Sequence, residues 1–195
     1  AAQIRALGMT VIDCGNLPDD PDQIGEALER AAAEADCIVS AGGVSVGEED
    51  HVKSQIEQRG ALDLWKLAIK PGKPLAFGHV AGTPIFGLPG NPVSAFITFA
   101  LVAKPWLIKR QGGRLVPTLR FPVRAAFSIT RPGTREEFLR VCLAGSGEVL
   151  RATLTGSQSS GVMTSLSEAD GVAVIAPGTT VAEGDWVEVM LLSTL

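Results

Sequence analysis

The sequence is poor in the residues that build disulfide frameworks and zinc sites. It contains three cysteines and two histidines in 195 residues. Cys14, Cys37 and Cys142 are widely spaced and form no CxxC pair, so neither a disulfide-stapled fold nor a cysteine-based metal site is expected. We expect reduced thiols that fill space in the core.

Long apolar runs and an excess of positive charge are also absent. The longest apolar stretch, residues 93–103, is too short to cross a bilayer, and nothing at the start resembles a signal peptide. The formal net charge of -4 argues against general affinity for nucleic acid, because such binding relies on many Lys and Arg side chains. We therefore expect a cytoplasmic protein without membrane or nucleic-acid partners, in which any anion site is a local cluster.

What is present is the composition of a folded protein. With 46% hydrophobic and 19% charged residues, the chain can bury a core, and its length suits one large domain or two small ones. Residues 1–7 read as the end of a helix closed by Gly8. Because an α/β domain normally opens with a strand, we expect a preceding segment to be missing.

The first half of the chain alternates strand-like and helix-like segments. Asp20 is placed to cap a helix that begins with Pro21, and Gln23 occupies the capping-box position. Further helices are expected over residues 50–59, closed by Gly60, and 92–110, and strands over residues 9–14, 37–40, 74–78 and 83–87, the last two as a hairpin. The alternation predicts a mostly parallel, three-layer α/β domain whose ligand site lies beyond the carboxyl ends of the strands.

The second half has a different pattern. From about Leu115, short β-like runs alternate with turn residues, and no long helix is evident. Such a pattern is typical of a small β-barrel or sandwich. We therefore predict an α/β domain over residues 1–113 and a β-barrel domain over residues 114–195, with residues 111–114 as the hinge.

A glycine loop occupies residues 40–50, Ser-Ala-Gly-Gly-Val-Ser-Val-Gly-Glu-Glu-Asp, between a strand and a helix. Its glycines allow backbone N–H groups to approach a phosphate, although many strand-to-helix turns need glycine for steric reasons alone. The acidic residues Glu48, Glu49 and Asp50 fit two interpretations. They stabilise the first helical turn, or they supply a carboxylate to a metal ion that bridges phosphate oxygens.

Two further motifs are candidates for an anion site. In residues 66–74, Lys-Leu-Ala-Ile-Lys-Pro-Gly-Lys-Pro, prolines hold Lys70 and Lys73 in a rigid turn that suits an oxyanion, although surface lysines are usually only solvated. In residues 88–94, Leu-Pro-Gly-Asn-Pro-Val-Ser, a helix beginning near Pro92 directs free N–H groups outward. The alternative is an ordinary proline-started helix.

Together, these three motifs, in this order and separation, resemble the molybdopterin molybdenumtransferase family, which includes the C-terminal domain of gephyrin. Residues 155–160, Thr-Gly-Ser-Gln-Ser-Ser, and the terminal Gly184-Asp185 pair resemble the family's fourth domain. The resemblance implies a molybdopterin-binding α/β domain lacking its first, Thr-Gly-Asp strand, followed by a β-barrel domain. It also implies a C-terminal fragment without the two N-terminal domains, inactive alone.

The family's activity implies roles for individual residues. Molybdate is inserted into adenylylated molybdopterin and AMP is released, with a divalent cation such as Mg²⁺. The resemblance assigns catalysis to Asp50, also the metal ligand, to Ser45 and to Lys70. It assigns molybdate binding to Lys70, Lys73, Arg140 and Ser160, a set of donors that balances the charge of a tetrahedral dianion. Substrate-binding positions are implied at Asp19, Gly42, Gly43, Ser45, Gly47, Glu48, Lys66, Pro89, Gly90, Asn91, Pro92 and Ser94.

Partners and alternatives also follow from the resemblance. It implies small-molecule substrates, a homodimer of the full-length protein and an upstream adenylyltransferase. The alternatives are molybdopterin adenylyltransferase, which typically ends after the α/β domain, and a gephyrin-like docking module, for which no peptide groove is identifiable. The nicotinamide-nucleotide amidase group fits residues 88–94 poorly.

Overall fold

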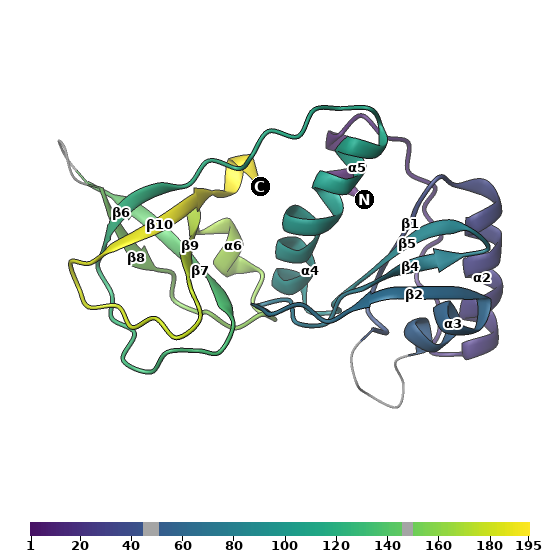
Figure 1. Ribbon diagram of the computed structural model, residues 1–195, viewed down its shortest axis with the longest axis horizontal. Helices are drawn as coiled ribbons and strands as arrows, with labels where there is room; N and C mark the ends of the chain where they lie inside the picture. The colour runs from purple at the N-terminus through teal and green to yellow at the C-terminus, as the bar shows by residue number, and fades with distance from the viewer. Residues whose placement is uncertain (45–50, 146–149) are drawn as a thin grey trace. The chain divides into compact units, whose positions relative to one another are not determined.

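The chain divides into two compact units. The computed structural model describes residues 1–44, 51–145 and 150–195. The α/β unit comprises Ala1–Leu67, Pro74–Gly90 and Thr98–Leu115, and the barrel unit comprises Ala68–Lys73, Asn91–Ile97 and Val116–Leu195. Each unit is described by itself (Figure 1).

The α/β unit is built on a four-stranded sheet of order β1-β5-β4-β2. β1 (Ile38–Ala41) is parallel to β5 (Thr83–Leu88), whereas β4 (Ala76–Val80) is antiparallel to both β5 and β2 (Gly60–Trp65). The expectation of a mostly parallel sheet is therefore wrong. The physical reason lies in the short connections, because a two-residue turn such as that between β4 and β5 joins only antiparallel neighbours.

Helices cover both faces of this sheet. Two helices, α2 (Pro21–Glu34) and α3 (His51–Arg59), contact each other and the sheet. The other helices named here are α5 (Lys104–Arg110) and the short α1 (Ala2–Ala6). On β5, Ile85 packs into a cluster with Ile24 and Ile56, whereas the next residue, Phe86, lies 5.3 Å from the Trp106 ring of α5. Because successive strand residues face opposite ways, the two sets of helices cover opposite faces, as the three-layer expectation requires.

The start of α2 follows the expected cap. The Asp20 carboxylate accepts a hydrogen bond from the Gln23 N–H at 2.9 Å, and Pro21 occupies the first turn. This backbone hydrogen bond is the main cause that lowers the pKa of Asp20 below its ordinary value. The sequence prediction of this helix start is confirmed.

One local prediction was wrong and another was confirmed. Residues 9–14 form no strand, and Ile12 is 53% exposed, because no described strand pairs with this segment. The helix expected to end before Gly60 does so, because α3 ends at Arg59, and Gly60 then opens the edge strand β2. A methyl group on Gly60 would collide with the His79 carbonyl of β4, so glycine is required there by close strand contact.

A long helical segment follows β5. It consists of α4 (Pro92–Thr98), a π-helical segment (Phe99–Ala103) and α5. Pro105 lacks an N–H, and its ring crowds the carbonyl four residues earlier, at Leu101 within the π segment, which explains the local widening. Among the described residues, Pro92–Arg110 is the segment long and apolar enough to span a bilayer, a test that core helices also pass.

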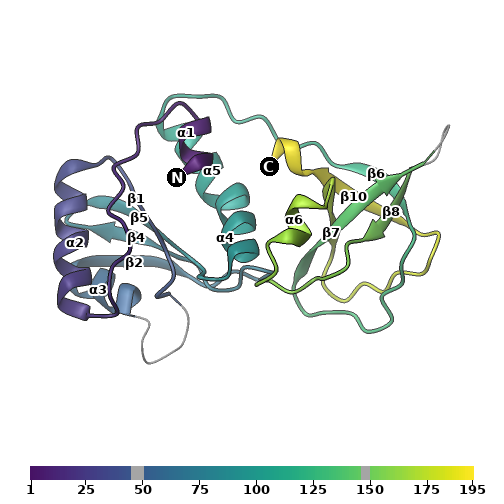
Figure 2. The same cartoon turned by 180° about the vertical axis from the view of Figure 1, so that it is seen from behind.

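The barrel unit contains five strands that close on themselves. They are β6 (Phe121–Ala125), β7 (Glu136–Ala144), β8 (Arg151–Leu154), β9 (Gly171–Ile175) and β10 (Trp186–Leu191), seen from the other side in Figure 2. Closure results because β7 pairs with both β8 and β9. The short strand β3 (Ile69–Lys70) pairs in parallel with the start of β7, and α6 (Thr164–Ser167) and a 3₁₀ helix (Leu192–Thr194) complete the unit. The predicted β-barrel is confirmed.

The long strand β7 has two distinct faces. Leu139, Val141 and Leu143 belong to the barrel core, together with the facing Ala173 of β9. Alternation therefore places the side chain of Arg140 on the outer face of the strand.

The β4–β5 turn yields a stability prediction. Ala81 has φ +48° and Gly82 has φ +85°, as a type I′ turn requires, and a non-glycine residue is strained in this region. We expect Ala81→Gly to stabilise the protein by about 0.5–1 kcal/mol, since relief of strain exceeds the entropy added to the unfolded chain. Ala33→Gly, the same change on an exposed position of α2, should destabilise it by up to about 1 kcal/mol. Urea unfolding that gave both variants the same sign would contradict this explanation.

Candidate functional site

Two of the predicted motifs meet at the carboxyl ends of β1 and β5. The Gly42 N–H donates to the Leu88 carbonyl at 2.9 Å. A methyl group on Gly90 would lie 3.6 Å from the Gly42 Cα. Gly42 has φ +98°, a conformation that side chains with a Cβ rarely adopt. The glycine loop and the Leu-Pro-Gly turn, in which Pro89 is buried, are thus neighbours where open α/β sheets bind ligands.

The glycines of the loop also have a steric role. A methyl group on Gly43 would lie 2.6 Å from a Val52 side-chain carbon, so α3 can approach the loop only because glycine is present. The Gly43 carbonyl accepts a hydrogen bond from the Lys53 N–H at 3.3 Å. The predicted site residues that lie outside the described residues are Ser45, Gly47, Glu48 and Asp50, together with Glu49 of the acidic run.

An indole ring gathers two ammonium groups next to the loop. The Trp65 Nε1 donates to the Val44 carbonyl at 3.3 Å. The Nζ atoms of Lys66 and Lys53 lie 3.8 and 4.3 Å from the centroid of the Trp65 ring. Cation–π attraction therefore holds both ammonium groups near the end of the glycine loop.

Lys53 was not among the residues predicted from the sequence. It is three positions after Asp50 and also forms an ion pair with Glu57 at 3.0 Å, one helical turn further along α3. The only signal available was the spacing from the acidic run, which does not distinguish a site residue from a helix-surface lysine. Asp19, the remaining predicted position of this unit, is exposed.

The predicted molybdate-binding residues all lie in the barrel unit. Lys70 and Lys73 flank the turn that contains the cis Lys70-Pro71 peptide bond. The Lys70 Nζ lies 3.2 Å from a carboxylate oxygen of Glu137, and Lys73 is exposed. The lysine turn therefore offers one paired and one exposed ammonium group.

Arg140 is buried and hydrogen-bonded within the protein. It is 1% exposed; its Nε donates to the Ser165 hydroxyl at 3.2 Å, and its Nη2 donates to the carbonyls of Ser157 and Ser159, each at 3.1 Å. The Gln158 amide bonds to both the N–H and the carbonyl of Arg140 at 2.9 Å. Burial lowers the pKa of Arg140 from its ordinary value. These contacts make the guanidinium the anchor of the loop over residues 157–165.

The loop over residues 157–165 places Ser160 beside the motif over residues 88–94. The Ser160 carbonyl accepts a hydrogen bond from the Val93 N–H at 3.1 Å, so the loop packs beside Asn91, Pro92 and the buried Ser94. Glu137 and Arg140, three residues apart, project from opposite faces of β7. Two segments of the barrel unit thus supply the predicted oxyanion set: the lysine turn supplies Lys70 and Lys73, and β7 with its anchored loop supplies Arg140 and Ser160.

Cys37 is not an activated nucleophile. Burial raises the pKa of the Cys37 thiol to about 11, so it stays protonated at neutral pH. Cys142 donates to the Glu168 carbonyl at 3.2 Å, and Cys14 is exposed. Within residues 1–44, 51–145 and 150–195, no three His, Cys, Asp or Glu side chains gather as a metal site.

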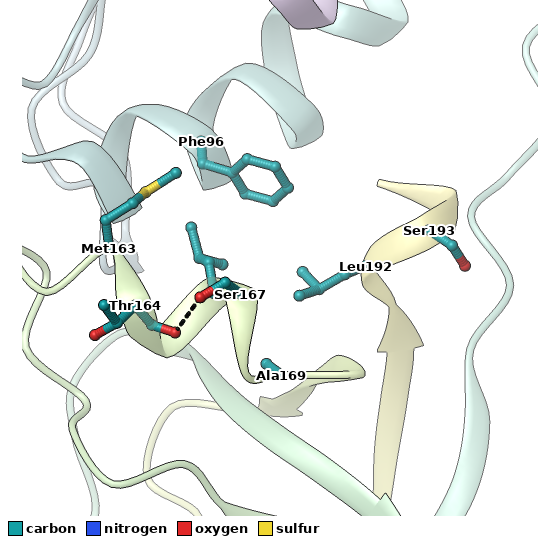
Figure 3. Close-up of a pocket in the computed structure, with 8 residues that line it drawn as sticks. Phe96, Met163, Thr164, Ser167, Ala169, Leu192 and Ser193 are labelled. Carbon is teal, nitrogen blue, oxygen red and sulfur yellow. Dashed lines mark hydrogen bonds between the residues drawn. The ribbon is translucent and has the colours of Figure 1, made fainter.

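An apolar hollow opens in the barrel unit (Figure 3). It is lined mainly by apolar side chains, namely Phe96 of α4, Met163, Leu166, Ala169 and Leu192. Ser167 also lines the hollow, and its hydroxyl donates a hydrogen bond to the Thr164 carbonyl at 2.9 Å. Because no charged group lines this hollow, it does not suit molybdate or a phosphate.

Two protein-family models match the chain, one in its first half and one in its second half. Residues 1–109 match the family described as "Probable molybdopterin binding domain". Residues 122–192 match the family described as "MoeA C-terminal region (domain IV)".

Similar proteins and structures point the same way. A molybdopterin molybdenumtransferase of Haemophilus influenzae is 46% identical over 109 residues, covering 56% of this chain and 27% of that protein. One from Bacillus subtilis is 30% identical over 201 residues, covering 98% and 45%. The chain thus spans less than half the length of these relatives.

Solved structures share the fold across nearly the whole chain. A molybdenum cofactor biosynthesis protein from Pyrococcus furiosus aligns with a TM-score of 0.73 at 25% identity, over 97% of this chain and 61% of that one. A molybdopterin biosynthesis moeA protein from Pyrococcus horikoshii aligns with a TM-score of 0.70 at 26% identity, over 97% and 44%.

The anchoring role of Arg140 predicts the effect of its removal. Arg140→Ala should destabilise the barrel unit by about 3 kcal/mol, because it removes several hydrogen bonds from a charged donor and leaves loop carbonyls without partners. Hydrogen exchange over residues 157–165 should accelerate. Arg151→Ala, on an exposed position of β8, is the control and should change stability by less than about 0.5 kcal/mol. Unchanged exchange in the Arg140 variant would refute the anchoring role.

Proposed function

Because this chain belongs to the molybdopterin molybdenumtransferase family, we propose that it takes part in inserting molybdate into adenylylated molybdopterin, with release of AMP. The observation that carries the proposal is the contact between the glycine loop and the Leu-Pro-Gly turn, through Gly42 and Leu88, at the carboxyl ends of parallel strands. Two ammonium groups, on Lys53 and Lys66, lie beside this contact. A phosphate-bearing ligand suits such a place, where backbone N–H groups and lysines are both available.

Each group of residues then has a chemical task. Gly42 and Gly43 allow close approach of the nucleotide phosphates, Ser45 supplies a hydroxyl there, and Lys66 supplies positive charge. Residues Asp19, Gly47, Glu48, Pro89, Gly90, Asn91, Pro92 and Ser94 are proposed to shape the substrate site. As AMP leaves, ammonium groups already in place stabilise the charge that develops on the phosphate.

Molybdate is proposed to bind at the lysine turn. Lys70 and Lys73 balance the charge of the dianion, and the Ser160 hydroxyl adds a directional donor. Arg140 contributes by fixing the loop that presents Ser160, since its hydrogen bonds hold Ser157, Ser159 and Ser165.

A divalent cation is proposed at Asp50. Carboxylate oxygens are the ligands that Mg²⁺ prefers, and the acidic run Glu48, Glu49 and Asp50 supplies them next to the proposed phosphate site. Mg²⁺ bound there would neutralise phosphate charge.

The wider setting is also a proposal. A homodimer, an upstream adenylyltransferase that supplies the adenylylated pterin, and a cytoplasmic location fit a biosynthetic enzyme of this family. The adenylyltransferase activity itself is disfavoured as an alternative, because residues 122–192 match a C-terminal region of the molybdenumtransferase type.

Binding of tungstate, a molybdate analogue, tests the proposal on the chain itself. We expect Lys70→Gln and Lys73→Gln each to weaken tungstate binding about tenfold in calorimetry, because each removes one charge-assisted partner. Lys109→Gln, which changes an exposed lysine of α5, should leave affinity unchanged. Equal affinities in all variants would remove the lysine turn from the site.

The role of Asp50 requires a turnover assay. A chimera can be made in which this chain replaces the matching region of the Bacillus subtilis relative. We expect Asp50→Asn to leave melting unchanged, because asparagine caps a helix as well as aspartate. AMP release from adenylylated pterin should fall by orders of magnitude, since an anionic metal ligand is lost. Wild-type turnover in this variant would exclude Asp50 from the chemistry.

A further inference from the structure

Lys70, a proposed molybdate ligand, already has a counter-ion within the protein. Its Nζ lies 3.2 Å from Oε2 and 3.4 Å from Oε1 of Glu137. The side chain of Lys70 is 54% exposed, whereas that of Glu137 is 16% exposed. The carboxylate is therefore the confined partner, and the long lysine side chain is the one that can move.

The backbone fixes this pairing. β3 runs parallel to β7, with Lys70 aligned to Glu137. Two hydrogen bonds hold β3 in this register: the Glu136 N–H donates to the Ala68 carbonyl at 3.0 Å, and the Arg135 Nη1 donates to the Ile69 carbonyl at 3.0 Å. The ion pair is thus set by strand pairing as well as by side-chain attraction.

Glu137 is also confined from the other side. A methyl group on Gly133 would collide with the Glu137 carboxylate, so the carboxylate packs directly against the glycine backbone. Glu137 further lies opposite Ile175 of β9, at the end of the barrel. An anion that approaches Lys70 consequently meets a negative charge that cannot readily withdraw.

We infer that Glu137 sets the oxyanion affinity of the lysine turn, as a fixed negative charge beside Lys70 that repels any oxyanion bound there. This inference rests on the proposed function. In the absence of an oxyanion, Glu137 holds the ammonium group in place; when an oxyanion is bound, its carboxylate repels that anion. The affinity is thereby kept moderate, which allows molybdate to leave the turn for the pterin.

The charge of the ligand gives this role a specific signature. Coulomb repulsion by one carboxylate is twice as strong for a dianion as for a monoanion at the same distance. Tungstate and perrhenate are both tetrahedral oxyanions, with two and one negative charges. Removing the Glu137 charge should therefore change the logarithm of the tungstate affinity about twice as much as that of perrhenate.

The neighbouring glutamate supplies a matched control. Glu136 precedes Glu137 on β7, and its carboxylate lies 3.9 Å from the Arg120 guanidinium. Alternation along the strand directs its side chain to the other face. Glu136→Gln therefore makes the same chemical change one residue away without altering the partner of Lys70.

The experiment measures tungstate and perrhenate binding by calorimetry in the 195-residue chain and in three variants. We expect Glu137→Gln to bind tungstate about tenfold more tightly and perrhenate about threefold more tightly, with both affinities within about twofold of wild type in Glu136→Gln. Thermal melting should show that all three glutamine variants fold. Lys70→Gln should weaken tungstate binding.

The outcomes separate the inference from the function on which it rests. If Lys70→Gln weakens tungstate binding but Glu137→Gln leaves it unchanged or weakens it, the inference is overturned and the proposed molybdate site stands. The inference is also overturned if Glu137→Gln changes both anion affinities by equal factors, since that result indicates rearrangement instead of charge. If neither the unsubstituted chain nor any variant binds tungstate, or if Lys70→Gln leaves tungstate affinity unchanged, the proposed molybdate site fails.

Discussion

The parallel pairing of β1 with β5 is the constraint on which the candidate site depends. Parallel strands end at the same edge of a sheet, so whatever follows each strand is brought together there. Here the glycine loop follows β1 and the Leu-Pro-Gly turn follows β5, and the Gly42 to Leu88 hydrogen bond joins them. An antiparallel pairing would have placed the two motifs at opposite edges, and neither could then have contributed to one phosphate site.

A buried guanidinium has the corresponding task in the barrel unit. The loop over residues 157–165 has little regular structure, and its carbonyls need donors once they are turned away from water. Arg140 supplies them from the outer face of β7, and the loop in turn receives the Val93 N–H at the start of α4. Arg140, which the sequence analysis expects to bind molybdate, thus also holds in place the loop that carries Ser160.

Local signals in the sequence predicted local structure well. The Asp20 cap and the β4–β5 hairpin each depend on a few adjacent residues and were confirmed. The strand predicted over residues 9–14 was wrong, and β2 was not predicted, because a strand is decided by its pairing partner and not by its own composition. Two features could not be predicted because they join segments far apart in the sequence, which no local pattern connects. One is the inclusion of residues 68–73 and 91–97 in the barrel unit, and the other is the ion pair between Lys70 and Glu137.

The local partners of the lysines explain how a protein with a net charge of -4 can carry the proposed anion sites. A cluster of unpaired lysines would repel itself and attract any anion in solution. In this structure three candidate lysines each have a local partner: Lys53 and Lys66 lie over the Trp65 ring, and Lys70 lies against Glu137. A π face attracts an ammonium group without cancelling its charge, whereas a carboxylate competes with the ligand. Lys66 therefore keeps its full charge for the proposed phosphate, whereas Lys53 also pairs with Glu57. At the lysine turn, Glu137 competes with the proposed oxyanion for Lys70, as a site requires when the oxyanion is to be passed on.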